Sequence, residues 1–322
     1  MLDKQNIGRV PAVTPADGVS QRPRIRFFSK LSPLERFTAK WGIVFVLPLI
    51  IGLIAFVYGP VLMALALSFT DYDAINFPNW VGLANFEYLL NWDFFWTAFG
   101  NTAYMVIGFV AICTPLSLVL ALALNHKLRG ITVFRSAFFL PVIISMISAG
   151  LLWKWLYLPD FGALNWFLSI FGVPAIPWVS ERMWAIPAII LMSVWKAAGY
   201  FAIIFLASLQ GVPQEYYEAA KIDGASVWHS FWHITLPIIS PTTFFIIVTM
   251  IIGSALVFDQ IWVITKGGPA YGTLSVVMLI YRTGFELLQF GRASAVTVVF
   301  FIIIMLVTIV QFRVQRQWVN YD

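Results

Sequence analysis

Six long apolar segments constrain this 322-residue chain more than any other feature of its sequence. We place them at Ile43–Phe69, Phe99–Leu124, Val133–Tyr157, Trp184–Leu209, Thr242–Thr265 and Ala293–Phe312. Each holds roughly 20 or more mostly apolar residues, which as a helix would cross about 30 Å of hydrocarbon. Because backbone N–H and C=O groups find no water in lipid, runs of this length are expected to be helical there. The pattern predicts an all-α, polytopic membrane protein with six transmembrane helices.

The composition supports the same class of protein. Hydrophobic residues make up 60% of the chain and charged residues 11%, whereas soluble domains are roughly half apolar and roughly a quarter charged. The lone cysteine, Cys113, excludes an internal disulfide and a cysteine-built metal site. His229 and His233 lie four residues apart with no evident third ligand nearby, so we expect no metal site.

Charge divides the chain into three parts and orients it. Residues 1–40 form a basic, proline-containing tail, residues 41–315 hold the six spans, and residues 316–322 form a second tail. Fourteen Lys and Arg residues lie near the two ends and around the loops at 125–135 and 210–241, against four in the alternate loops. The excess of positive charge predicts that both termini and the 210–241 loop are cytoplasmic. A basic arm directly ahead of a span favours contact with membrane lipid over nucleic acid.

Polar side chains within the apolar segments are candidates for a solute pathway, because an ionisable group costs about 2.5–3.5 kcal/mol to insert in a membrane. The candidates are Ser193, Trp195, Lys196 and Tyr200 in the fourth segment, and Ser254, Asp259 and Gln260 in the fifth. Ser193, Lys196 and Tyr200 are spaced to share one helical face. As an alternative to solute contact, Lys196 and Asp259 would neutralise each other or hold helix ends together.

The sequence contains no motif that indicates a nucleotide-binding or catalytic site. It contains no G-x-x-x-x-G-K-[ST] phosphate loop, so we predict that the chain does not bind ATP in that way and holds no cofactor. No Ser/His/Asp arrangement and no paired intramembrane carboxylates point to catalysis. We therefore predict no catalytic residues and a chain that is not an enzyme.

The stretch Gln214–Pro241 is the longest polar interruption in the apolar second half of the chain. Pro213 suits the first turn of a helix, and Gly224 suits the left-handed conformation that often ends one. Ser226 can cap a second short helix, which Pro237 would break before the fifth span. We predict a helix–turn–helix on the cytoplasmic face, with an ordinary amphipathic interface helix as the alternative.

This loop resembles the signature loop of the membrane subunits of bacterial ABC importers. The family pattern is E-A-A, three residues, G, nine residues and I-x-L-P. It occurs here as Glu218-Ala219-Ala220, Gly224, Ile234 and Leu236-Pro237. Four further segments resemble the carbohydrate-importer permeases, similar to the first permease of maltose, glycerol-phosphate and oligosaccharide systems. They are Ile222-Asp223-Gly224-Ala225, Phe258-Asp259-Gln260-Ile261-Trp262, Thr265-Lys266-Gly267-Gly268-Pro269 and Gly291-Arg292-Ala293-Ser294-Ala295.

The resemblance implies that the loop docks in a cleft of a separate ATPase subunit and transmits its closure to the spans. The docking segment would comprise Glu215, Glu218, Ala219, Ala220, Asp223 and Gly224. In this assignment Glu218 makes a polar contact, the two alanines allow close packing, and Gly224 turns the chain.

The resemblance also implies partners, a location and a substrate. The partners would be a second homologous permease subunit, two ATPase subunits that hold ATP and Mg, and a periplasmic or lipid-anchored solute-binding protein. The location would be the bacterial inner membrane, and the substrate a carbohydrate. Lys196 in the path would favour an acidic, uronate-containing sugar, with a neutral oligosaccharide as the alternative.

Two other classes of protein are considered. A self-sufficient secondary transporter or channel for a polar solute would be expected to have inverted repeats or discontinuous helices and no docking loop. The sequence shows no clear internal repeat. An intramembrane enzyme is disfavoured by the missing catalytic constellation.

Overall fold

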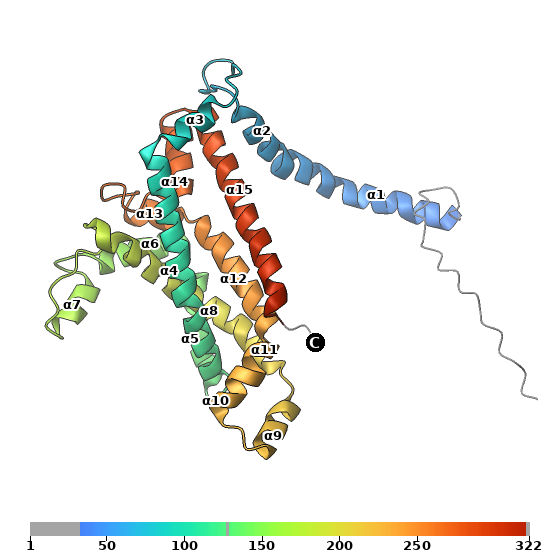
Figure 1. The fold of residues 1–322 in the computed structure, drawn as a ribbon, viewed down its shortest axis with the longest axis vertical. Helices are drawn as coiled ribbons and strands as arrows, with labels where there is room; N and C mark the ends of the chain where they lie inside the picture. The colour runs from blue at the N-terminus through green and yellow to red at the C-terminus, as the bar shows by residue number, and fades with distance from the viewer. Residues whose placement is uncertain (1–32, 127–128, 320–322) are drawn as a thin grey trace, which may run out of the picture. The chain divides into compact units, whose positions relative to one another are not determined.

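The computed structural model describes residues 33–126 and 129–319, and the chain divides into two compact units, Met1–Tyr58 and Gly59–Asp322. Most of the predicted basic tail, residues 1–40, lies outside the described residues, as does the end of the predicted 316–322 tail. Helices make up most of the described chain (Figure 1), which confirms the predicted all-α class. The described residues contain no β-strand, and one isolated antiparallel bridge joins Thr70 and Trp80.

The described part of the first unit is helical. Helix α1 (Pro33–Leu53) continues into a π-helical turn, η1 (Ile54–Tyr58). It begins ahead of Ile43, where the first span was predicted to start, and a proline is compatible with a first helical turn because its missing N–H would be unbonded there. Its large apolar side chains are mostly exposed within this chain. A helix that is apolar on all sides is typical of a membrane span.

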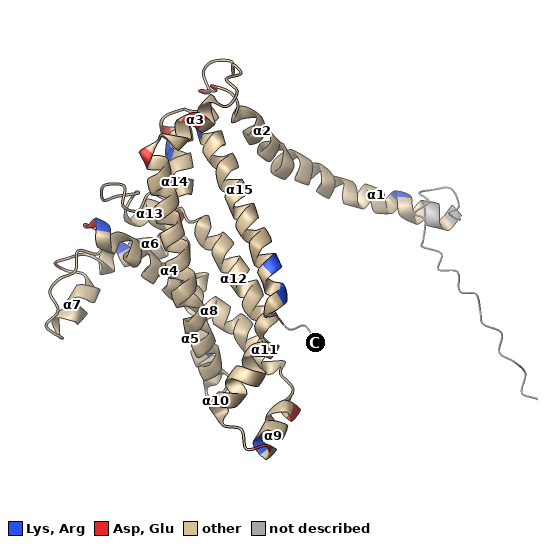
Figure 2. Ribbon diagram, in the orientation of Figure 1, with Lys and Arg blue, Asp and Glu red and all other residues tan. Residues whose placement is uncertain are grey.

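Three long helices form the frame of the second unit: α4 (Asp93–Leu124), α8 (Arg182–Gln210) and α15 (Phe290–Val314). The next in length are α2 (Gly59–Leu67), α5 (Ile131–Ile143), α6 (Met146–Leu156) and α12 (Ser240–Ala255). The short helices are α3 (Ala84–Leu90), α7 (Ala163–Ser169), α9 (Gln214–Ile222), α10 (Val227–Ser230), η2 (Phe231–Thr235), α11 (Leu236–Ile238), α13 (Asp259–Ile264), α14 (Val276–Tyr281), η3 (Arg282–Glu286) and η4 (Gln315–Gln317). Charged residues gather near α3 and α9, at opposite ends of this unit (Figure 2).

Among the described residues, four helices are long and apolar enough to cross a membrane: Phe37–Leu67, Asp93–Leu124, Arg182–Gln210 and Phe290–Gln317. Two bent helix pairs raise this number to six if each pair counts as one span. The pairs are α5 with α6, and Val227–Ile238 with α12. The polytopic membrane fold is therefore confirmed, with four spans, or up to six if each bent pair counts as one.

The third predicted span, Val133–Tyr157, is broken into two helices. It consists of α5 and α6, which are bent by 98° relative to each other. Pro141 has no N–H to contribute to α5, and the Ser145 side chain caps α6 by accepting a 3.2 Å hydrogen bond from the backbone N–H of Ser148. These two local features favour a break between the helices.

The fifth predicted span, Thr242–Thr265, is also interrupted. Residues 256–258 between α12 and α13 are not helical. Asp259 is therefore the first residue of α13, whereas the sequence predicted it to lie in the interior of a span. A carboxylate is stabilised at this position because the first turn of a helix has unbonded N–H groups.

Helix α8 lies at the centre of the second unit, with 56% of its most apolar stretch buried. It packs against α4 and α5. A Cβ atom at Gly199 of α8 would lie 1.9 Å from the carbonyl oxygen of Phe138 in α5. A Cβ atom at Gly108 of α4 would lie 2.6 Å from Cδ1 of Ile190 in α8. Glycine at these two positions therefore allows the three helices to approach closely.

Candidate functional site

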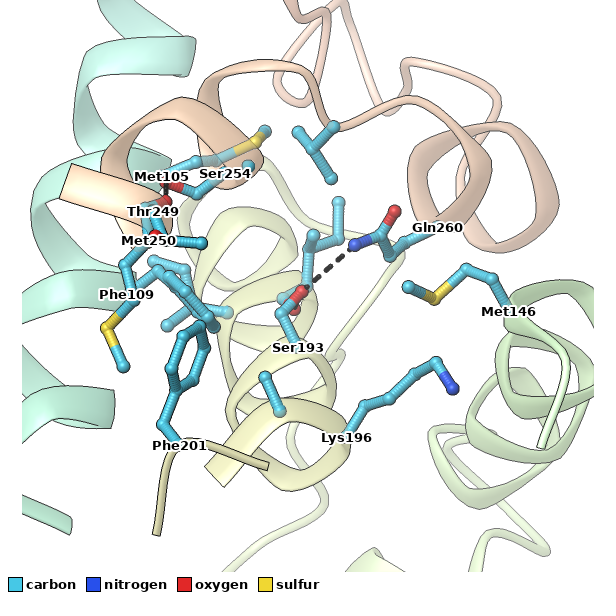
Figure 3. A pocket seen from close by; sticks show the side chains of 15 residues that line it. Met105, Phe109, Met146, Ser193, Lys196, Phe201, Thr249, Met250, Ser254 and Gln260 are labelled. Atoms are coloured by element: carbon cyan, nitrogen blue, oxygen red, sulfur yellow. Dashed lines mark hydrogen bonds between the residues drawn. The ribbon is translucent and has the colours of Figure 1, made fainter. Parts of the chain in front are cut away.

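A cavity of about 250 Å³ lies between α4, α8 and α12, with contributions from α6 and α13 (Figure 3). Four of the predicted pathway residues line it: Ser193, Lys196, Ser254 and Gln260. Much of the remaining lining is apolar and includes Met105, Phe109, Phe201 and Met250. A mostly apolar cavity with a few convergent polar groups is typical of a small-molecule site.

The uncharged polar side chains of the cavity retain capacity for further hydrogen bonds. The Ser193 hydroxyl donates to the carbonyl oxygen of Ile189 at 2.8 Å, and Gln260 Nε2 donates to Ser193 Oγ at 3.4 Å. The Ser254 hydroxyl donates to the carbonyl oxygen of Met250 at 2.6 Å. Each hydroxyl oxygen can also accept, and the Gln260 amide can both donate and accept. The set can therefore bind the hydroxyl groups of a polar solute.

The ammonium of Lys196 is bonded to the end of α5. Its Nζ donates to the carbonyl oxygens of Pro141 at 3.0 Å, Val142 at 3.4 Å and Ile144 at 2.5 Å. The last carbonyl groups of a helix have no partner within the helix, so a cation there stabilises the helix end. Figure 3 shows the Lys196 side chain extending toward the side of the cavity on which Met146 lies. The structure therefore favours the alternative in which Lys196 holds a helix end.

The other alternative, neutralisation of Lys196 by Asp259, is not found. Within residues 33–126 and 129–319 the one ion pair joins Arg282 and Glu286, with 3.9 Å between Nε and Oε2. Asp259 is exposed at the start of α13 and does not line the cavity. Residues 256–258, which are not helical, separate Asp259 from α12.

Two further predicted pathway residues lie outside the cavity lining. Trp195 packs edge-on against Trp153, with 5.5 Å between the ring centroids. Tyr200 is 42% exposed and packs against Phe201. The helical face that was predicted to hold Ser193, Lys196 and Tyr200 therefore contributes only its first two members to the cavity.

Other lining residues were not predicted. Thr249, Met250, Gly253 and Ser254 share one face of α12, so helical spacing counted back from Ser254 could have identified them. Met146 could not be identified in this way. It reaches the cavity because α6 begins after a sharp bend, and no spacing rule along the sequence gives that bend.

The segment between α8 and α12 consists of α9, a turn, and the run α10, η2 and α11. Gly224 follows α9 with φ +75°, a conformation that glycine adopts without steric cost. The backbone N–H of Ala225 donates to the carbonyl oxygen of Ala220 at 2.8 Å, which satisfies one group at the end of α9. Ser226 then caps α10 by accepting from the N–H of His229 at 3.2 Å.

The predicted docking residues are largely accessible on this segment. Glu215, Glu218, Ala219, Asp223 and Gly224 are exposed, and Ala220 is half-buried. A chain that approached α9 would meet two carboxylates together with an alanine-lined backbone. The segment is thus available to another protein.

Residues 113–320 match the family described as a binding-protein-dependent transport system inner membrane component. A probable ABC transporter permease protein of Bacillus subtilis, YesP, is 35% identical over 286 residues, which are 87% of this chain and 92% of that protein. The trehalose/maltose transport system permease protein MalF of Thermococcus litoralis is 34% identical, over 88% of this chain and 97% of that protein.

The fold is also similar to a chain in the crystal structure of a bacterial alginate ABC transporter in complex with alginate pentasaccharide-bound periplasmic protein. The TM-score is 0.77 at 24% sequence identity, over 88% of this chain and 97% of that chain. At this identity the likeness shows a shared fold.

The named relatives are permeases, in agreement with the prediction of a transport subunit that is not an enzyme. The family match spans α8, the predicted docking segment and α12, which together hold most of the residues discussed above. The chain therefore belongs to the family of inner membrane components of binding-protein-dependent transport systems.

Proposed function

We propose that this chain is a permease subunit of an ATP-driven importer and forms half of the pathway for a sugar or oligosaccharide. The observation that carries the proposal is the gathering of Ser193, Ser254 and Gln260 around one cavity in a chain of this family. Hydroxyl and amide groups match the hydroxyl groups of a sugar, and the apolar lining matches its C–H faces. The name of the trehalose/maltose relative supports this substrate class.

The rest of the system is supplied by partners. The exposed α9 segment docks a separate ATPase, of which two copies hold ATP and Mg, and a second homologous permease completes the pathway. A solute-binding protein, periplasmic or lipid-anchored, delivers the sugar. We place the chain in a bacterial inner membrane with both termini and the 210–241 loop in the cytoplasm, on the charge asymmetry of the sequence.

The test is uptake by the co-purified complex in proteoliposomes. Radiolabelled maltose, trehalose, lactose and alginate pentasaccharide are offered with and without ATP. We expect ATP-dependent accumulation of at least one of them. Gln260→Leu should raise the KM for that sugar about three- to tenfold, the effect of losing a hydrogen bond between uncharged groups. Ser136→Ala, on the exposed side of α5, is the control. Uptake that is independent of ATP would identify a secondary transporter or channel instead.

We propose separately, on the basis of Lys196, that the transported sugar is acidic. Its side chain lines the cavity while its ammonium bonds the end of α5. We expect Lys196→Gln to reduce uptake of alginate pentasaccharide more than uptake of maltose, with the exposed Lys154→Gln as control. An equal loss for both sugars would mean that Lys196 acts only on the helix end and does not recognise an acidic sugar.

A further inference from the structure

Helix α9 has few attachments to the rest of the chain. Seven of its nine residues are exposed, and the two that are half-buried are Tyr217 and Ala220. In the described part of the chain, one hydrogen bond joins a side chain of α9 to another helix. It links the hydroxyl of Tyr217 to Oγ1 of Thr235 over 2.9 Å. Tyr217 also packs against the hydrophobic core, so this residue attaches α9 to the rest of the chain through both a polar and an apolar contact.

Thr235 is well placed to receive such a force. It is 5% exposed and ends the π-helical turn η2, and α11 follows it directly. Helix α12 begins at Ser240 and carries Ser254 to the cavity. The contact from Tyr217 thus joins α9 to the element that leads into the cavity wall.

A second cavity makes this route selective. About 260 Å³ of space separates α9 and η2 from the ends of α4 and α8, and its lining includes Leu122, Leu209, Tyr217 and Thr235. Space of this kind weakens direct packing of α9 on the long helices, because packed contacts transmit strain and gaps do not. The bonded pair crosses from α9 to η2 at the edge of that space.

We infer that the Tyr217–Thr235 hydrogen bond is the link by which movement of α9 reaches α12 and the solute cavity. Both residues are positioning residues, and the inference rests on the proposed docking of an ATPase on α9. Thr235 ends a π-helical turn, and turns of this kind occur frequently at functional sites.

The test uses a single cysteine in the cavity wall to report changes in its accessibility. The buried native thiol is removed as Cys113→Ser, and Ser254→Cys places a reporter on the cavity wall. In the complete membrane complex, the rate of maleimide labelling is compared without nucleotide and with Mg-ATP plus vanadate. We expect the parent complex to show a change in labelling rate. Tyr217→Phe and Thr235→Val should each reduce that change about three- to tenfold, as expected for loss of one hydrogen bond.

Controls separate the link from folding and docking. The ATPase should co-purify with both variants, and their melting temperatures should lie within about 5 °C of the parent, the shift expected for loss of one hydrogen bond. Thr235→Ser keeps the hydroxyl and should restore the response. Tyr216→Phe changes the preceding tyrosine, which is 54% exposed, and should have no effect. The double variant Tyr217→Phe with Thr235→Val should respond like either single variant, because both remove the same bond.

Contrary results separate the two levels of the inference. A normal nucleotide response in Tyr217→Phe, or additive losses in the double variant, overturns the link and leaves the proposed function intact. Loss of ATPase co-purification in Tyr217→Phe also overturns it, since the residue would then act in docking. A parent complex that neither retains an ATPase nor responds to nucleotide overturns the proposed function, and the link with it.

Discussion

Lys196 brings a charge into a helix bundle, at a cost of about 2.5–3.5 kcal/mol on insertion scales. Three carbonyl oxygens at the end of α5 offset that cost by accepting hydrogen bonds from its ammonium. The same bonds satisfy carbonyl groups that α5 leaves unpaired where it meets α6. The bonds between Lys196 and α5 therefore stabilise both a half-buried charge and a broken span.

This role predicts a loss of stability when the ammonium is removed. Lys196→Met keeps the length and apolar stem of the side chain but leaves the carbonyl groups without a donor. We expect destabilisation by about 2 kcal/mol, the usual worth of hydrogen bonds to a charged group. Thermal unfolding in detergent micelles measures it, and Lys154→Met, on an exposed part of α6, should unfold like the parent. Equal melting temperatures for the two variants would contradict the role.

A second residue-scale prediction concerns the contact of α5 with α8. Alanine at position 199 would place its Cβ 1.9 Å from the Phe138 carbonyl oxygen, so one backbone must move. We expect Gly199→Ala to destabilise the chain by about 1–3 kcal/mol, as overpacking usually does. Gly253→Ala is the matched control, because a Cβ there has no neighbour within 4 Å and alanine favours the helix. Differential scanning calorimetry measures the melting temperatures of the two variants, and equal values would refute the close approach.

At the scale of elements, the turn after α9 sets the geometry of the proposed docking segment. Gly224 has φ +75°, whereas proline is restricted to about −65°. We expect Gly224→Pro to disrupt the end of α9 and abolish co-purification of the ATPase. Gly224→Asn should retain it, because asparagine tolerates the left-handed region. Retention of the ATPase by the proline variant would show that this turn is not required for docking.

At the scale of the whole molecule, the sequence contains no G-x-x-x-x-G-K-[ST] phosphate loop, and we propose that a partner ATPase supplies the energy for transport. We expect the purified chain alone to release no phosphate from ATP, and the complex with its ATPase to release it. Colorimetric phosphate measurements on both preparations test this. Hydrolysis by the chain alone, at a rate that persists after removal of co-purifying proteins, would contradict the division of labour.

The sequence by itself determined the class of fold and the form of the docking segment. Hydropathy over twenty residues is a sum over residue types, and it identifies membrane helices without knowledge of their neighbours. The turn at Gly224 and the cap at Ser226 depend on backbone groups within a few residues, so local rules were sufficient there. The family resemblance rests on this stretch and on short segments at 258–262, 265–269 and 291–295, which are also read without knowledge of their neighbours.

Only the tertiary structure decided which polar groups meet. Lys196 bonds carbonyl oxygens that lie 52 to 55 residues away in the sequence, and this pairing accompanies the break between α5 and α6. The break after α12 removes Asp259 from the predicted pathway but leaves Gln260 in the cavity wall. A broken span and a straight span have the same summed hydropathy, because the sum contains no information about which distant donor bonds a free carbonyl group. For that reason the site emerged only once the helices were packed.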